Sequence, residues 1–209
     1  MDNLDLITDR IRQAFSSKDA TREKTLPLCR EVIRFSSNAI RAVHRQEFDL
    51  AKEFLQSASN LLDEVKQAIA EHNEFGYTGF VRDAQKEFAE GRLTLAIVTG
   101  EQLPDPVELG IHAAAYLNGM GEAVGELRRY LLDSIRGGDL SRGDELLSAM
   151  DDIYSILVTI DFPDAITGGL RRTTDMVRGV LERTRSDLTL LTRQKSLEEK
   201  IRAFEQGMK

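Results

Sequence analysis

The segment "EFDLAKEFLQSASNLLDEVKQAIAEH" (residues 47–72) has apolar side chains at the spacing of a helix. They recur every three or four residues, which places them along one helical face, whereas a strand would alternate at every second residue. The predicted buried face consists of Phe48, Ala51, Phe54 or Leu55, Ala58, Leu61 or Leu62, Val65 and Ile69. The segment therefore predicts a long amphipathic helix that packs against other helices.

The N-terminal part of the chain continues the helical period. A first helix is expected over the stripe Leu4, Ile7, Ile11 and Phe15, ending near residues 16–19. Ser17 or Asp19 can cap a second helix that runs to about Arg45, with Pro27 as a kink or a break.

The rest of the chain also reads as helices and turns. One helix is expected to contain residues 85–100 and to end at Gly100, and the next to run from Asp105 and Pro106 to the glycines at 137–138. Two more are expected, from Asp139 or Ser141 to about Ile160 and over residues 165–207. No stretch alternates at period two for long enough to predict a sheet. We therefore expect an all-α fold of about seven helices in one domain, residues 1–209.

Composition limits the possible classes of protein. The 209 residues carry a formal net charge of −7, and no apolar run approaches the roughly 18 residues that a membrane span needs. The single cysteine, Cys29, cannot form an internal disulfide, which favours a cytoplasmic location. An acidic chain is a poor nucleic-acid binder on its outer surface, although basic residues gathered in a groove or cavity can still bind phosphate.

Two glutamates, Glu87 and Glu90, lie one helical turn apart at the start of an apolar run. Their carboxylates can reach a shared point, where hard oxygen ligands suit Mg²⁺ or Mn²⁺. A carboxylate from a neighbouring helix would complete such a site, and Asp151 and Asp152 are the candidates. Their spacing does not choose between the two aspartates.

Glutamate pairs of this kind also occur on solvated helix faces, and Glu71 and Glu74 form a second example in this chain. The same E-x-x-E pattern occurs in all-α nucleoside triphosphate pyrophosphohydrolases, but no glutamate here has the aspartate three residues later that those enzymes need. Ferritin-like di-metal sites require E-x-x-H, which is also absent from the sequence. The pattern by itself therefore favours a solvated face over a metal site.

A basic stripe runs along the second expected helix. Arg30, Arg34, Arg41 and Arg45 step by four, seven and four residues and so share one face. Arginine grips phosphate oxygens with two parallel hydrogen bonds, so the stripe suits a nucleic-acid backbone. Pairing with acidic neighbours on a solvated face explains it equally well. His44 can belong to the same stripe, and Arg128 adds a weaker indication of phosphate contact.

Several motifs together resemble the translin family. They are "TREKTLPLCREVIRFSSNAIRAVHR" (21–45), "KEFAEG" (86–91), "AYLNGMGEAVGELRR" (115–129), "SIRGGDLSRG" (134–143) and "MDDIYSIL" (150–157). The third is similar to the family pattern Y-L-x-G-x-x-[DA]-x-x-G-E-L-x-R. The resemblance covers residues 20–190 and is greatest to translin-associated factor X.

The resemblance implies a bundle of seven helices and assembly into closed, octamer-like barrels that enclose RNA or single-stranded DNA. It also implies that Glu87, Glu90 and Asp152 are catalytic residues that bind Mg²⁺ or Mn²⁺, as in the factor X subunit, a Mg²⁺-dependent endoribonuclease. The family's glycine after the aspartate is Ile153 here, so Asp151 stays an alternative.

On this basis we expect an endoribonuclease that acts on single-stranded RNA inside a homo-oligomeric barrel, with the arginine stripe lining the cavity. A translin-like partner subunit is also compatible with the sequence. The alternatives are a non-catalytic protein that binds single-stranded RNA or DNA, as translin does, and a purely structural helical scaffold.

Overall fold

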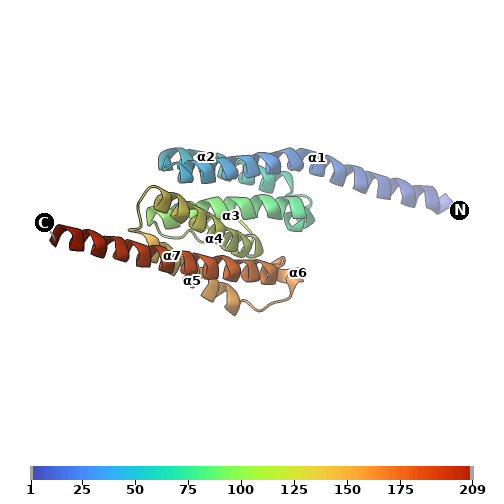
Figure 1. Cartoon of the computed structure of the whole chain (residues 1–209). Helices are drawn as coiled ribbons and strands as arrows, with labels where there is room; N and C mark the ends of the chain where they lie inside the picture. Colours follow the sequence, from blue (N-terminus) through green and yellow to red (C-terminus); the bar gives the residue numbers. More distant parts are fainter. Residues whose placement is uncertain (1, 208–209) are drawn as a thin grey trace. The chain divides into compact units, whose positions relative to one another are not determined.

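The computed structural model describes residues 2–207 and, except at positions 2 and 77, their side chains. Within this range the chain forms seven α-helices, one 3₁₀ helix and no strand (Figure 1). The elements are α1 (Asp2–His44), α2 (Phe48–Ala68), the 3₁₀ helix η1 (Asn73–Tyr77), α3 (Gly79–Thr99), α4 (Ala113–Arg136), α5 (Gly143–Thr159), α6 (Asp164–Thr167) and α7 (Leu170–Gly207). The all-α prediction is confirmed. Among the described residues, no helix has the length and apolar character of a membrane span.

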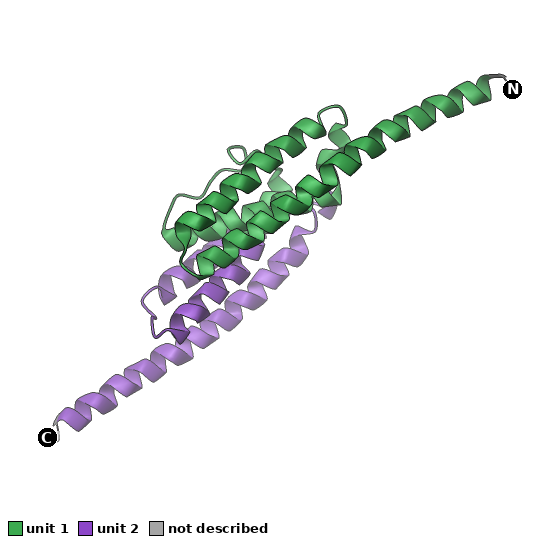
Figure 2. Ribbon diagram, turned by 90° about the horizontal axis from the view of Figure 1, so that it is seen from above, with its two compact units in different colours: residues 1–120 green, residues 121–209 purple. Residues whose placement is uncertain are grey.

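The helices group into two compact units, residues 1–120 and residues 121–209, which Figure 2 colours separately. The boundary falls inside α4, which continues through it without a break. The expectation of one domain over residues 1–209 stays a prediction.

In the first unit, the C-terminal half of α1 packs against α2 and α3. Most of the predicted face of α2 is confirmed, because Ala51, Leu55, Ala58, Leu62 and Val65 are all buried. Of its two ends, Ile69 is buried just past the helix, whereas Phe48 is only half-buried. Where the spacing left two choices, the structure buries Leu55 and Leu62. The core of this unit is therefore the one that the helical period predicts.

The first two predicted helices are one helix of 43 residues, α1, so the predicted break near residues 16–19 is wrong. Ser17 cannot cap a new helix because its Oγ lies 2.9 Å from His72 Nε2, and the neighbouring Lys18 pairs with Glu74 at 2.9 Å. Pro27 lies inside the helix, where it removes one main-chain hydrogen bond without ending the helix.

The predicted start of the fifth helix at Asp105 is also wrong, because α4 begins at Ala113. Asp105 Oδ1 accepts a hydrogen bond from the Val107 N–H at 2.7 Å, which makes a local turn in place of a helix cap. Gly110 then has a φ of 66°, a left-handed conformation that an α-helix excludes.

In the second unit α5 packs against α7. The α5 stripe is largely as predicted, with Leu146, Met150, Ile153 and Leu157 buried, whereas Ile160 lies just past the helix and is partly exposed. The predicted last helix over residues 165–207 is divided into α6 and α7. Gly168 and Gly169 separate them with φ values of 66° and 88°.

Candidate metal centre

Helix α3 carries the E-x-x-E pair and is buried along most of its circumference. It ends where predicted, because Gly100 adopts the left-handed conformation of a C-cap, with φ 71°. Glu90 is buried, with 8% of its surface exposed, and Glu87 is half-buried. The pair therefore does not lie on a fully solvated face. This burial makes the carboxylates costly unless positive charge or hydrogen bonds compensate them.

Helix α4 approaches α3 closely at Gly119. A Cβ atom at this position would come within 2.6 Å of the Lys86 carbonyl oxygen, 2.8 Å of the Ala89 Cβ and 3.0 Å of the Glu90 nitrogen. Only glycine fits without a shift of one helix, so Gly119 sets the spacing at which the start of α4 faces the glutamate pair.

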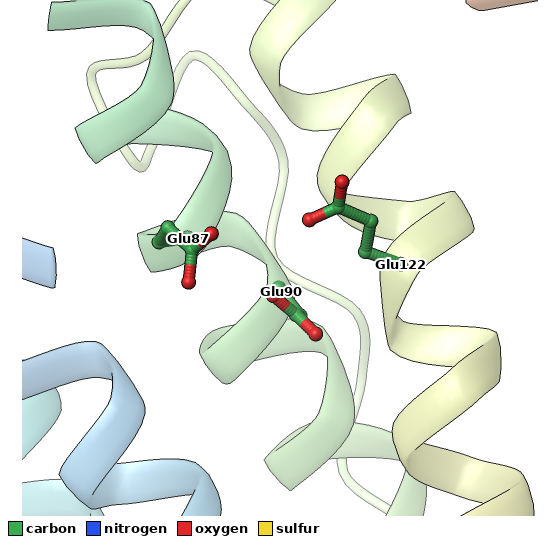
Figure 3. Close-up of side chains that lie close together, drawn as sticks. All are labelled: Glu87, Glu90 and Glu122. Carbon is green, nitrogen blue, oxygen red and sulfur yellow. The ribbon is translucent and has the colours of Figure 1, made fainter. Parts of the chain in front are cut away.

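Glu122 lies three residues after Gly119 on the same helix and turns its carboxylate toward α3 (Figure 3). Glu87, Glu90 and Glu122 each offer an oxygen atom, and these three oxygens lie within 4.8 Å of one another. Glu122 is half-buried, like Glu87. Three acidic side chains from two helices thus converge on one point.

The donor set fits a hard divalent cation. Mg²⁺ and Mn²⁺ prefer carboxylate oxygens and keep several waters, and three carboxylates leave coordination positions for those waters. The Lys86 Nζ, 3.8 Å from Glu87 Oε1, places a positive charge at the edge of the cluster. A divalent cation bound among the three carboxylates would reduce their mutual repulsion.

Asp151 and Asp152, the predicted third ligands, lie on α5 and are both exposed. Asp151 Oδ1 accepts a hydrogen bond from Arg185 Nη2 at 3.0 Å. Among the described residues, the acidic cluster has Glu122 as its third member and includes neither aspartate. A role for Asp152 or Asp151 in the metal site, or in catalysis, stays a prediction.

Glu122 is the site residue that sequence reasoning missed. It stands seventh in the stretch from Tyr116, where the family pattern Y-L-x-G-x-x-[DA] allows an acidic residue. That family position is the only local indication of Glu122, because this residue is not part of an E-x-x-E pair and its meeting with Glu87 and Glu90 depends on packing.

Three members of the arginine stripe lie on α1 and the fourth, Arg45, directly follows it. All four are exposed, as a shared solvent-facing side requires. Three have local partners: Arg34 pairs with Glu31, Arg41 with the Asn38 side chain, and Arg45 with Glu47 at 2.8 Å. The hydrogen bond that Arg45 donates to the Glu47 carboxylate raises the pKa of Arg45 above its already high ordinary value. Such exposed pairs are weak, so phosphate can compete for these guanidinium groups.

The other two predicted nucleic-acid contacts differ from the stripe. His44 is half-buried at the end of α1. Arg128 donates from Nη1 to Thr184 Oγ1 at 3.0 Å and from Nη2 to Asp187 Oδ2 at 2.6 Å, which ties α4 to α7. This arrangement supports a structural role for Arg128. Contact of either residue with nucleic acid stays a prediction.

Comparisons with known proteins add independent information. No family model matches the chain. It is 29% identical over 196 residues to an uncharacterized protein of Methanocaldococcus jannaschii, covering 92% of this chain and 86% of that protein.

Solved structures give a more informative match. The structure of AfC3PO in complex with duplex RNA is similar at a TM-score of 0.80 and 31% identity, covering 90% of this chain and 97% of that one. The crystal structure of AfC3PO matches with the same values. Apo-NeC3PO has a TM-score of 0.77, with 88% of this chain and 96% of that chain covered, but is 17% identical and supports the fold alone. The particular likeness to factor X stays a prediction. The extent and sequence identity of the AfC3PO match show that this chain belongs to the translin family, together with the C3PO proteins.

Proposed function

We propose that this protein is a metal-dependent endoribonuclease that cleaves RNA inside an oligomeric assembly. The observation that carries the proposal is the convergence of Glu87, Glu90 and Glu122, two half-buried and one buried, within 4.8 Å. Three carboxylates that converge in a partly buried place form the set of hard oxygen donors that a divalent cation prefers.

Glu87, Glu90 and Glu122 would hold a Mg²⁺ or Mn²⁺ ion, which when bound supplies a water of lowered pKa and offsets charge on the scissile phosphate. Because α3 and α4 touch at Gly119, the three side chains would be in place before substrate arrives. Lys86, beside Glu87, would draw a phosphate oxygen toward the cluster. A thiol nucleophile is disfavoured, since burial raises the pKa of Cys29 to about 11.

RNA is the proposed substrate because the AfC3PO relative is in complex with duplex RNA. The exposed stripe of Arg30, Arg34, Arg41 and Arg45 would hold phosphates without reading sequence. The motifs favour single-stranded RNA and, as a further ligand, single-stranded DNA, whereas the relative favours a duplex, so the substrate test must include each form.

The assembly we propose is a closed, octamer-like homo-oligomer in the cytoplasm, with a translin-like partner subunit as the alternative. Enclosure would reconcile a net charge of −7 with an anionic ligand, because the arginine stripe would face the cavity and the acidic surface the solvent. Native mass measurement of the purified protein counts the subunits and detects a second chain.

The decisive test is cleavage of end-labelled single-stranded and duplex RNA with Mg²⁺. We expect Glu90→Gln to abolish cleavage while RNA binding stays within about twofold. The matched control is Glu71→Gln, in the second E-x-x-E pair of this chain, which should cleave like the wild type. RNA binding without cleavage by the wild type would favour the non-catalytic alternative. Equal cleavage by Glu90→Gln and the wild type would refute the metal site.

A further inference from the structure

A second recess lies in the first unit, among α2, η1, α3 and the segment that precedes α4. Its volume is about 400 Å³, and none of the three clustered glutamates lines it. This volume falls within the range of pockets that hold small molecules.

The inner wall of the pocket is apolar. Leu62 and Val65 come from the last turns of α2, Ile69 directly follows that helix, and Val81 comes from the first turn of α3. All four are buried, so they form a fixed surface rather than mobile side chains. Such a wall suits the flat or branched body of an organic molecule.

The polar side chains that line the pocket are those of Lys66, Asn73, Gln85 and His112, of which Asn73 and His112 can both donate and accept hydrogen bonds. Gln85 is buried, and its Oε1 accepts the His112 main-chain N–H at 3.2 Å, so its remaining polar atom is the amide nitrogen, a donor. Lys66, at the exposed edge, can only donate. Although 35 of the 209 residues are Asp or Glu, no carboxylate is among the described lining residues. The pocket is therefore better suited to an anion than to a cation.

Glycine keeps the polar side of the pocket open. A Cβ atom at Gly76 would come within 3.3 Å of His112 Nε2, which is tighter than ordinary contact. Gly76 therefore leaves space beside the imidazole that any larger residue would reduce. Gly79, three residues later, has no heavy atom within 4 Å of an added Cβ and so offers a matched control.

We propose that this pocket binds a small organic anion, with its charged head near Lys66 and His112 and an apolar or aromatic body against Leu62, Val65 and Ile69. The head is a carboxylate or a phosphate monoester, which share the negative charge that the donors recognise. This site is separate from the acidic cluster, and its occupant need not be RNA.

The test is isothermal titration calorimetry on the full-length protein in EDTA, which prevents metal-dependent binding. Adenosine 5′-monophosphate carries a phosphate head group and 4-phenylbutyrate a carboxylate head group. Two controls separate the parts of the nucleotide: adenosine lacks the negative charge, and inorganic phosphate lacks the organic body. We expect at least one of the two organic anions to bind. Adenosine and inorganic phosphate should each bind at least about tenfold more weakly than that anion.

Variants locate the binding. Gly76→Ala and Lys66→Met should each lower the affinity for the anion by about fivefold or more. The first substitution narrows the pocket, and the second removes the positive charge at its edge. Gly79→Ala should bind like the wild type. The proposal is overturned if neither anion binds at millimolar concentration, or if the Gly76→Ala and Lys66→Met variants both bind as tightly as the wild type. Circular dichroism of each variant checks that the helices are intact.

Discussion

Gly119 of α4 lies so close to α3 that a Cβ atom on it would come within 2.6 Å of the Lys86 carbonyl oxygen. This contact is with main chain, which cannot rotate away as a side chain can. Gly119 also lies one helical turn before Glu122, whose carboxylate lies close to those of Glu87 and Glu90. The distance between the two helices and the geometry of the acidic cluster therefore depend on the same glycine.

Gly119→Ala should destabilise the protein and loosen the acidic cluster. Forced separation of the two packed helices should cost about 1–3 kcal/mol of unfolding free energy, measured by urea denaturation. Mn²⁺ affinity should fall in parallel, since Glu122 moves with α4. The control is Gly125→Ala, on the same helix, where no heavy atom lies within 4 Å of the added Cβ. If Gly119→Ala is as stable as this control, the close approach is not a constraint.

Glu122→Gln should weaken Mn²⁺ binding by about tenfold or more, because the charge of a site's ligands sets its affinity for a divalent cation. Titration of the protein with Mn²⁺, followed by electron paramagnetic resonance of the free ion, measures this directly. Glu126→Gln, one turn further along α4, serves as the control. Parallel titration of Asp152→Asn and Asp151→Asn tests the predicted aspartate ligand. An unchanged affinity in Glu122→Gln would remove this residue from the site.

Pro27→Ala should stabilise the protein. Pro27 is exposed inside α1 and has no N–H to donate to the Glu23 carbonyl, so alanine restores a helical hydrogen bond and improves helix propensity. The gain in unfolding free energy should approach about 3 kcal/mol, the usual difference between proline and alanine inside a helix. A loss of stability on this substitution would show that residues 2–44 do not form one continuous helix.

Cys29 should make stability depend on pH in the alkaline range. Burial raises the pKa of its thiol from 9.0 to about 11, so the folded state holds the proton more tightly than the unfolded state. This contribution is fully present below pH 9 and is lost as the pH rises from 9 to about 11, on the order of 2–3 kcal/mol in all. The difference in unfolding free energy between wild type and Cys29→Ala should shrink over that interval. A constant difference would contradict a buried neutral thiol.

Arg30→Ala and Arg41→Ala should each weaken RNA binding similarly for all sequences. Each should also reduce the slope of log K against log salt concentration by about 1, if each guanidinium contacts one phosphate. Arg12→Ala, an exposed arginine near the start of the same helix that pairs with Asp9, is the control. Slopes that stay at the wild-type value in both variants would exclude the stripe from the RNA contact.

Local patterns in the sequence predict much of the fold. The buried face of α2 and the left-handed cap at Gly100 follow from helical period and from the conformational freedom of glycine, which need no knowledge of distant residues. The unbroken α1 could not be predicted, because Ser17 and Lys18 find partners at His72 and Glu74, more than fifty residues away. The late start of α4 reflects a local turn at Asp105 that competes with the helix cap.

Part of the candidate site also follows from the sequence and part from packing. Glu87 and Glu90 lie one helical turn apart, so their spacing alone predicts that their carboxylates can approach each other. Glu122 joins them only because Gly119 allows two helices to touch, a packing effect that one sequence does not display. The tie of Arg128 to Asp187 is likewise tertiary, and it gives this arginine a structural partner that its position beside Arg129 does not suggest.

The position of a bound ion tests the central claim most directly. Crystals of the full-length protein grown with Mn²⁺ should give an anomalous scattering peak at about 2.1 Å from carboxylate oxygens of Glu87, Glu90 and Glu122. The same peak should be absent from crystals of Glu90→Gln grown in parallel. A wild-type crystal without a peak at these three glutamates, at a Mn²⁺ concentration that supports RNA cleavage, would contradict the account.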